Sequence, residues 1–205
     1  MSQRTIINVG RQFGSGGRSV ALSLGEKLGI QVYDNELIAK AAEQSGFNPE
    51  LFRNSDESKH VTLLGGIFSV NRYGSINRSG INESDLFKIQ SDAIREIASK
   101  DNAIFVGRAS DYVLRDMECL DVFVMAPLEE RKIRVSQRMN ISPDAAEALI
   151  LKRDKGREDY YNFFTFSHWG VASNYDLCID SSLLGIEGTA DFIIDFGRKS
   201  NLIFV

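Results

Sequence analysis

The sequence contains few cysteines and histidines, and it has no long apolar run. Its two cysteines, Cys119 and Cys178, lie far apart with no CxxC spacing, and only two histidines accompany them. This composition argues against a disulfide framework and against a zinc site. No stretch of about 18 uncharged apolar residues occurs, and the first residues lack the apolar core of a signal peptide. We therefore expect a cytoplasmic protein without a membrane-spanning segment.

The sequence also lacks an excess of positive charge. Lysine and arginine together number 24 against 28 aspartates and glutamates, which gives a formal net charge of −4. No global positive field is therefore available to attract a nucleic acid polymer or an anionic membrane surface. A phosphate or another small anion must instead be held by a local arrangement of residues.

Apolar periodicity predicts alternating strands and helices in a single domain that spans residues 1–205. The predicted strands are residues 5–9, 30–33, 103–106, 121–125 and 175–179. The predicted helices are residues 18–28, 83–100, 128–139, one that starts at Ser142 and Pro143, and residues 186–198. A further helix follows Asp34 and carries Leu37, Ile38, Ala41 and Ala42. This alternation predicts an α/β fold, a parallel sheet flanked by helices that binds ligands at the carboxyl ends of its strands.

Residues 56–82 interrupt this periodicity. The stretch GGIFSVNRYGSINRSGIN mixes glycine, serine and asparagine with aromatic side chains. We predict a flexible insertion, which is either a surface loop without a role or a flap that contacts the substrate, because long loops are often functional.

A glycine-rich segment, RQFGSGGRS at residues 11–19, lies between the first predicted strand and the first predicted helix. A helix N-terminus presents unpaired backbone N–H groups and the positive end of the helix dipole, which together favour phosphate. A glycine turn in an unrelated α/β domain is the alternative. The Ser19 hydroxyl is a candidate ligand for Mg²⁺. The predicted phosphate-binding residues are Gly14, Ser15, Gly16, Gly17, Arg18 and Ser19.

The usual lysine of a phosphate-binding loop is missing. When GxxxxGK[ST] is laid over residues 12–19, Gln12 replaces the first glycine and Arg18 replaces the lysine. In the nucleoside monophosphate kinase form, GxxGxGKGT, Arg11 replaces the first glycine, Gly17 the lysine and Arg18 the next glycine. Arg18 is our candidate for the lysine's role, since a guanidinium group binds phosphate bidentately.

At this point the sequence resembles the cytidylate kinase-like P-loop proteins over most of its length. The resemblance rests on INVGRQFGSGGRSVALSLGEKLG, VYDNELI, IFVGRASDYVLRD, LDVFVMAPLEERKIRV, KRDKGREDYYNFFT and NYDLCIDSS. It implies a P-loop NTPase-type sheet, the cofactors ATP and Mg²⁺, and a helical lid at residues 142–170. It also implies that Asp34 and Arg108 border a nucleoside monophosphate.

Two of these positions also have explanations that need no ligand. Asp34 precedes a helical pattern and is therefore a candidate N-cap, while its place after a strand suits binding of Mg²⁺ through water or of the acceptor. Arg108 follows the strand at residues 103–106. It either binds the acceptor's phosphate or pairs with Asp111 or Asp116.

The predicted lid carries a basic run in which Arg153 and Arg157 lie one helical turn apart. Like charges at that spacing repel unless an anion bridges them. The alternative is a solvated face that Asp154, Glu158 and Asp159 neutralise. In the lid role Arg153 and Arg157 join Arg18 as predicted catalytic residues, which reach the transferring phosphoryl group. We expect the aromatic side chains that follow, up to Trp169, to be core or hinge packing, with base stacking as the alternative.

The sequence as a whole predicts an ATP-dependent phosphotransferase of the nucleoside monophosphate kinase type that acts on CMP or a similar small acceptor. Two alternatives stay open. The missing lysine suits a nucleotide-binding sensor or interaction protein that has lost transfer. The residue after Arg108 is Ala109, where CMP kinases carry aspartate, and this departure suits a kinase of a non-nucleotide metabolite.

Overall fold

The computed structural model describes residues 4–38 and 83–205 of the chain. Five parallel strands form one sheet in the order β2-β3-β1-β4-β5. At the centre, Ile7 of β1 lies opposite Ile104 of β3 on one side and Leu120 of β4 on the other. The predicted insertion at residues 56–82, and Ala41 and Ala42, lie outside the described residues. The strands are β1 (Ile6–Arg11), β2 (Gln31–Tyr33), β3 (Ala103–Val106), β4 (Leu120–Met125) and β5 (Leu177–Asp180).

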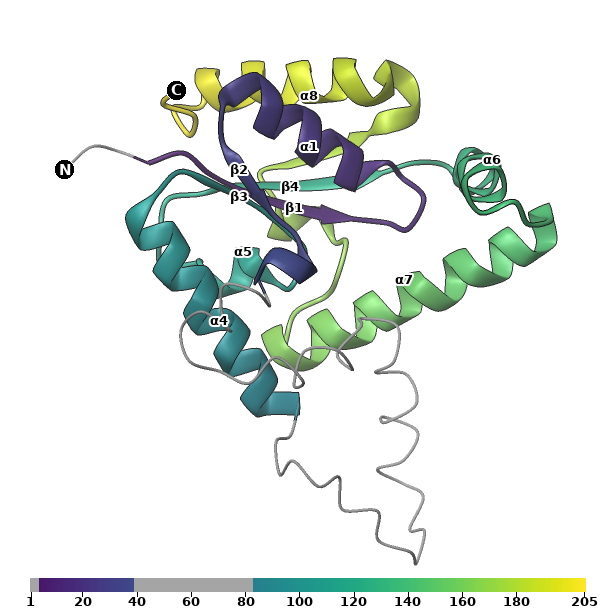
Figure 1. Ribbon diagram of the computed structural model, residues 1–205, viewed down its shortest axis with the longest axis horizontal. Helices are drawn as coiled ribbons and strands as arrows, with labels where there is room; N and C mark the ends of the chain where they lie inside the picture. The colour runs from purple at the N-terminus through teal and green to yellow at the C-terminus, as the bar shows by residue number, and fades with distance from the viewer. Residues whose placement is uncertain (1–3, 39–82) are drawn as a thin grey trace, which may run out of the picture.

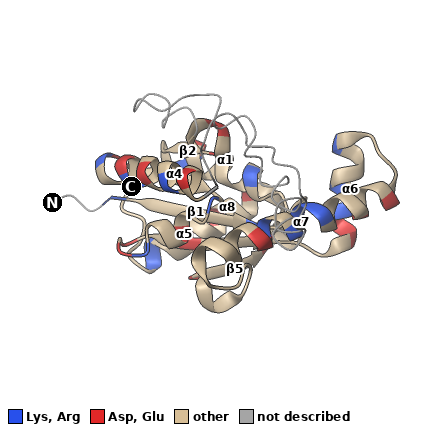
Figure 2. Cartoon of the chain, turned by 90° about the horizontal axis from the view of Figure 1, so that it is seen from below, with Lys and Arg blue, Asp and Glu red and all other residues tan. Residues whose placement is uncertain are grey.

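Helices cover both faces of the sheet, as the alternating pattern predicts (Figure 1). On one face lie α1 (Gly17–Leu28) and α8 (Ser181–Lys199), and on the other lie α4 (Glu83–Lys100) and the short α5 (Ser110–Val113). Two further helices of the described residues, α6 (Leu128–Met139) and α7 (Pro143–Thr165), extend from the end of the sheet (Figures 1 and 2). The α/β fold with a parallel sheet flanked by helices is therefore confirmed.

An apolar cluster lies on each face of the sheet. On the first face Leu24 of α1 and Ile193 of α8 pack with Val9 of the central strand, and all three are fully buried. On the second face Ile94 of α4 packs with Phe105 of β3. Each helix buries one apolar stripe, which is the arrangement that helical spacing of apolar residues predicts. None of the described helices is both long enough and apolar enough to span a bilayer.

The first strand is longer than predicted. Instead of ending at residue 9, β1 continues through Gly10 and Arg11, which lie opposite Phe123 and Val124 of β4. Pairing with a neighbouring strand overrides the turn propensity of a single glycine. Arg11 is consequently held by the sheet, and the connecting loop begins only at Gln12.

The last helix also differs from its prediction, because it begins at Ser181 rather than at residue 186. The Asp180 carboxylate accepts a hydrogen bond of 2.8 Å from the Ser182 N–H and caps this end. Gly185, with φ of 68°, then kinks the helix. The kink breaks the apolar period, so sequence periodicity detects only the segment after it.

At the amino end of the sheet, Asp121 is a partly buried carboxylate. The Asn8 side-chain amide donates to the Asp121 carboxylate over 2.8 Å, and the Asp121 backbone N–H donates to the Asp176 carboxylate, also over 2.8 Å. Burial raises the pKa of the Asp121 carboxyl to about 6, which the Asn8 hydrogen bond only partly opposes.

We expect Asp121→Asn to remove a pH-dependent loss of stability. Since the folded pKa lies above the unfolded one, the folded state holds the proton more tightly, and this stabilisation disappears as pH rises through about 6. Between about pH 4 and pH 8 the stability of the Asp121→Asn variant should therefore rise by about 2–3 kcal/mol relative to that of the wild type. Urea unfolding at both pH values measures this difference. The exposed Asp116→Asn is the matched control, and an equal response of the two variants would contradict the assignment.

Candidate functional site

The glycine loop is packed tightly against two helices. Gly14 and Gly16 have φ of 81° and 82°, a left-handed conformation that favours glycine. A Cβ on Gly14 would lie 2.9 Å from Val135 Cγ2 of α6, and one on Gly16 would lie 2.5 Å from Ile186 Cδ1 of α8. Both glycines are thus required by the conformation of the loop and by the space around it.

Ser15 stabilises the loop from the inside. Its side chain is fully buried, and its hydroxyl oxygen accepts a hydrogen bond of 3.3 Å from the Gly17 N–H. Its carbonyl oxygen accepts from Arg134 Nη1 over 2.9 Å and from the Ser181 hydroxyl. Arg134 therefore ties α6 to the loop and to the start of α8, which fixes the backbone N–H groups in place.

The open end of α1 forms a strongly basic pocket, which we call the loop pocket. The N-cap residue of this helix, Gly16, has no side chain to cap it, and Ser19 is exposed in its first turn. No acidic residue contributes to the pocket wall over the described part of the chain. Its cationic lining residues are Arg11, Arg18, Arg138 and Arg157.

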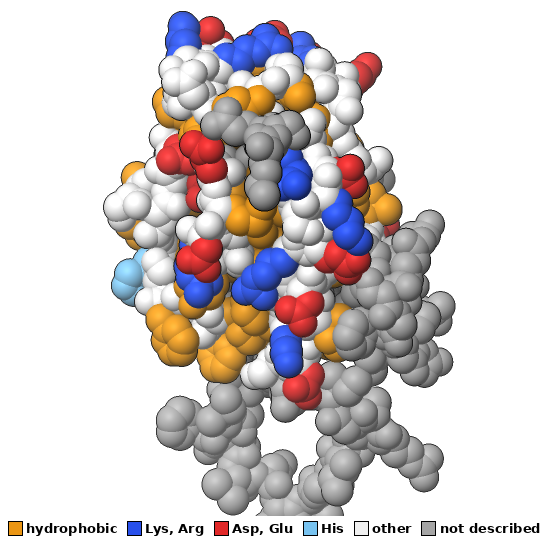
Figure 3. Space-filling view, turned by 90° about the vertical axis from the view of Figure 1, so that its left-hand side faces the viewer, with side chains coloured by type: hydrophobic (Ala, Val, Ile, Leu, Met, Phe, Trp, Pro, Cys, Tyr) orange, Lys and Arg blue, Asp and Glu red, His pale blue; other side chains and the backbone are white. Residues whose placement is uncertain are grey.

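This concentration of charge is local. At the opposite end of the molecule, basic and acidic side chains are interspersed (Figure 3). A helix N-terminus with several guanidinium groups and no carboxylate in the wall fits a polyphosphate. The residues present therefore fit the phosphates of ATP, and the exposed Ser19 hydroxyl fits a role beside a magnesium ion.

Arg18 and Asp34, two of the predicted site residues, form an ion pair with 2.8 Å between Arg18 Nη2 and Asp34 Oδ2. The Arg18 side chain is 64% exposed. Asp34 also accepts a hydrogen bond of 3.3 Å from the Leu37 N–H, so the carboxylate caps the helical residues 35–38. Burial acts to raise the pKa of Asp34, but the Arg18 and Leu37 hydrogen bonds outweigh it and hold the pKa below its ordinary value.

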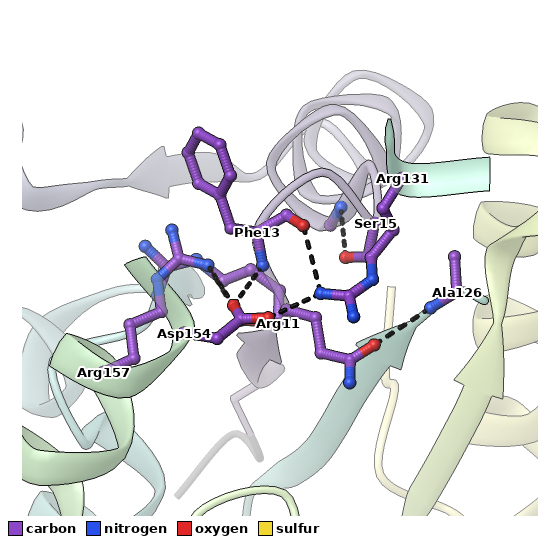
Figure 4. Close-up of polar contacts among 9 residues, drawn as sticks. Arg11, Phe13, Ser15, Ala126, Arg131, Asp154 and Arg157 are labelled. Atoms are coloured by element: carbon purple, nitrogen blue, oxygen red, sulfur yellow. Dashed lines mark hydrogen bonds and ion pairs between the residues drawn. The ribbon is translucent and has the colours of Figure 1, made fainter. Parts of the chain in front are cut away.

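The predicted lid helix α7 is fastened to the loop by Asp154 (Figure 4). This carboxylate accepts from the Phe13 N–H over 2.6 Å and from Arg131 Nη1 over 2.5 Å. Arg157 lies 3.9 Å from the same carboxylate and donates to the Arg11 carbonyl over 3.0 Å. Arg131 is 7% exposed, so the Asp154–Arg131 pair is a largely buried ionic contact between α6, α7 and the loop.

The two predicted lid arginines occupy different places. The guanidinium carbons of Arg153 and Arg157 lie 6.0 and 5.6 Å from the centre of the Phe13 ring, within the range of a cation–π contact. Arg157 also borders the loop pocket, whereas Arg153 is not part of its lining. The structure therefore brings Arg157 closer than Arg153 to the predicted phosphate site.

A second pocket opens at the carboxyl ends of β1 and β3, and we call it the β3 pocket. Arg108, which is 2% exposed, lies in its wall with φ of 62°, and Ala109 follows with φ of 51°. Two successive left-handed residues that are not glycine cost about 1 kcal/mol or more each, and such strain concentrates at functional sites. Arg11 and Arg157 line this pocket as well as the loop pocket.

Aromatic side chains from α7 complete the β3 pocket. The Tyr161 hydroxyl donates to Asp111 over 2.7 Å, and Arg108 lies 5.6 Å from the Tyr160 ring centre. Burial raises the pKa of the Asp111 carboxyl and that of the Tyr161 hydroxyl. Tyr160 and Tyr161 belong to a buried apolar cluster, so the packing prediction is confirmed for them, whereas Phe166 is 93% exposed and the prediction is wrong there.

Sequence reasoning did not select Arg11, Asp154 or Arg131 as site residues. The signal for Arg11 was present, because it stands at a mismatch in the loop motif. Asp154 and Arg131 carry no motif that distinguishes them from surface charges. Their importance follows from contacts between distant parts of the chain. Asp154 contacts Phe13, which lies 141 positions earlier, and Arg131, which lies 23 positions earlier.

Comparisons with known proteins agree with this architecture. The chain is 26% identical over 191 residues to a cytidylate kinase of Sulfolobus acidocaldarius, covering 92% of each chain. It is 28% identical over 190 residues to a cytidylate kinase of Methanobrevibacter smithii, covering 92% of this chain and 96% of that one.

Solved structures also share the fold. An uncharacterized protein from Eubacterium ventriosum has a TM-score of 0.69 at 26% identity, covering 94% of this chain and 98% of that one. A shikimate kinase from Acinetobacter baumannii has a TM-score of 0.51 at 15% identity, covering 98% and 97%, which indicates a common fold alone. The model of the cytidylate kinase-like family matches residues 6–183. The chain therefore belongs to the cytidylate kinase-like family.

Proposed function

We propose that this protein is an ATP-dependent phosphotransferase of the nucleoside monophosphate kinase type, which moves the γ-phosphoryl group of ATP to CMP or a similar small acceptor. The observation that carries the proposal is the meeting of two pockets at shared arginines. The loop pocket suits a polyphosphate, the β3 pocket contains the buried Arg108, and Arg11 and Arg157 line both. Family membership and the names of the relatives support the same activity.

The loop residues would hold the donor. The segment from Gly14 to Ser19 would direct backbone N–H groups toward the phosphates, and Arg18 would add charge at the outer edge of the loop. The Ser19 hydroxyl would hold Mg²⁺, which neutralises charge on the phosphates when it is bound.

The acceptor would occupy the β3 pocket. Arg108 is largely removed from water, so its attraction for the acceptor's phosphate is stronger than that of an exposed arginine. Asp34, at the neighbouring strand end, would orient the acceptor. The lid arginines Arg153 and Arg157 would neutralise charge on the transferring group and help exclude water.

A nucleotide-binding sensor or interaction protein is the second candidate. The observation that favours it is Gly17, which leaves the usual lysine position without a side chain. A kinase of a non-nucleotide metabolite is a third candidate. It is favoured by the buried Ala109, where cytidylate kinases carry aspartate.

The test is ADP production from Mg-ATP with the purified protein across a panel of nucleoside monophosphates and common metabolites, together with ATP affinity from calorimetry. Stimulation by CMP or a related monophosphate is the expected result. ATP binding without turnover for any acceptor would favour the sensor, and stimulation by a metabolite alone would favour the third candidate. Absence of ATP binding would contradict all three.

We expect Arg108→Ala to separate acceptor binding from donor binding. Removing a buried charge that meets the acceptor's phosphate should cost about 2–4 kcal/mol, which lowers kcat/KM for the acceptor by about a hundredfold. ATP affinity should stay within about threefold of the wild-type value, because Arg108 lines the β3 pocket and not the loop pocket. Arg115→Ala is the matched control, since Arg115 is exposed on the same segment. Equal losses of ATP and acceptor affinity would contradict this role.

A further inference from the structure

Residues 11 and 17 compete for one space. A Cβ built on Gly17 would lie 2.5 Å from Arg11 Cβ, 3.1 Å from Arg11 Cγ and 3.3 Å from Val124 Cβ. Non-bonded carbon atoms sit at about 3.5–4.0 Å, so a side chain at position 17 and the observed one at position 11 exclude each other. The stem of Arg11 fills the place from which a lysine at position 17 would extend.

The same two positions are mismatches in the nucleoside monophosphate kinase form of the loop. That form has glycine where this chain has Arg11, and lysine where it has Gly17. Because the positions are in contact, the two departures amount to one exchange. The cation has moved from the first residue of α1 to the last residue of β1.

We propose that Arg11 supplies the phosphate-binding charge of the missing loop lysine, and that Gly17 is glycine in order to admit it. The inference rests on the proposed function and adds a residue to its machinery. Arg11 borders both the loop pocket and the β3 pocket. Its guanidinium group would contact the phosphoryl group on its way from donor to acceptor, since planar guanidinium donors bind phosphate oxygens bidentately.

The backbone of Arg11 is held in place by its neighbours. Arg11 lies opposite Val124 in the sheet, and the N–H of the next residue, Gln12, donates to the Val124 carbonyl over 3.1 Å. The Arg157 side chain donates to the Arg11 carbonyl over 3.0 Å. Arg18, in the first turn of α1, has a side chain that is 64% exposed and that pairs with Asp34. Rigid placement of charge is what stabilises a phosphoryl transition state.

In the transfer itself, an acceptor oxygen forms a bond to the γ-phosphorus while the bond from that phosphorus to the β-phosphate oxygen breaks. Negative charge is spread over the transferring group and the leaving oxygen. Arg11, placed between the pockets, would neutralise it. Its loss should therefore affect kcat as well as ATP affinity.

The experiment compares Arg11→Met with the exchange variant Arg11→Gly/Gly17→Lys, by Mg-ATP and ADP calorimetry, thermal unfolding and kcat. Methionine keeps the Cβ and Cγ atoms over Gly17 and removes the charge and the N–H donors of the guanidinium group, so Arg11→Met should fold while ATP affinity falls at least tenfold. The exchange variant restores the usual loop pattern and should recover most of that affinity. Gly17→Lys alone should lower the unfolding temperature through its clash with Arg11. Arg4→Ala, an exposed arginine before the same strand, should leave ATP affinity unchanged.

The outcomes separate this inference from the proposed function. Wild-type ATP affinity in Arg11→Met, with turnover intact, would overturn the inference and leave the kinase assignment standing. A folded exchange variant that binds ATP no better than Arg11→Met would also overturn it. If the wild type binds ATP through Arg11 but transfers nothing, the inference holds and the kinase assignment fails. No ATP binding by the wild type would contradict both.

Discussion

Replacing Arg157 with alanine is expected to lower kcat by a hundredfold or more while weakening ATP binding far less. Arg157 is the arginine of the predicted lid that borders both pockets, and its side chain is 14% exposed. An arginine that neutralises a transferring phosphoryl group can be worth about 10³–10⁵ in kcat. We expect the lower part of that range or somewhat less, because Arg11 and Arg18 share the task. Steady-state ADP production and ATP calorimetry measure the two effects.

Two neighbouring substitutions serve as comparisons for Arg157→Ala. Arg153→Ala should lower kcat by a smaller factor, since Arg153 contacts Phe13 but does not line the loop pocket. Lys152→Ala removes an exposed charge of the same helix and should have no effect. An equal and small loss for all three variants would remove α7 from the mechanism. Thermal unfolding of Arg157→Ala shows whether loss of the hydrogen bond to the Arg11 carbonyl contributes.

Replacing Asp154 with alanine is expected to destabilise the protein by about 3–5 kcal/mol. The substitution leaves Arg131, which is 7% exposed, without its carboxylate, and it removes the acceptor for the Phe13 N–H. A buried charge without its partner is costly because water cannot replace the lost interaction. Chemical unfolding with urea measures the loss as a lower midpoint.

The control for Asp154→Ala is Glu158→Ala on the same helix. Glu158 forms an exposed ion pair with Lys155 at 3.1 Å, and such a pair contributes about 0–1 kcal/mol. The double variant Asp154→Leu/Arg131→Met should be less destabilised than Asp154→Ala, because it removes both buried charges together. A midpoint for Asp154→Ala equal to that of Glu158→Ala would show that the ionic contact does not hold α7 to the loop.

The sequence by itself determined most of the fold, because the signals for individual elements are local. The apolar period of α1 and the left-handed Gly29 at its end are properties of adjacent residues. The predicted helix at residues 128–139 and the strand at residues 103–106 have the same bounds in the structure. Among the boundaries that failed, the one at Arg11 is decided by a neighbouring strand and the one at Ser181 by a kinked glycine. The last strand, predicted at residues 175–179, lies at Leu177–Asp180.

The sequence also located the glycine loop between β1 and α1, since a glycine cluster between an apolar strand and a helical pattern marks a turn that leads into a helix N-terminus. It could not show that Arg18 would pair with Asp34, nor that Arg157 would border two pockets while Arg153 borders neither. Those facts depend on the direction in which each side chain leaves its helix relative to a distant strand.

Only the tertiary structure shows that the two mismatches of the loop motif are in contact. In the sequence, Arg11 and Gly17 are two separate mismatches, and Asp154 is one acidic residue within a basic run. In the structure, Arg11 occupies the space beside Gly17, and Asp154 joins α7 to Phe13 and Arg131. Periodicity and propensity report on neighbours along the chain, whereas exclusion between side chains and pairing of buried charges arise only where distant segments pack together.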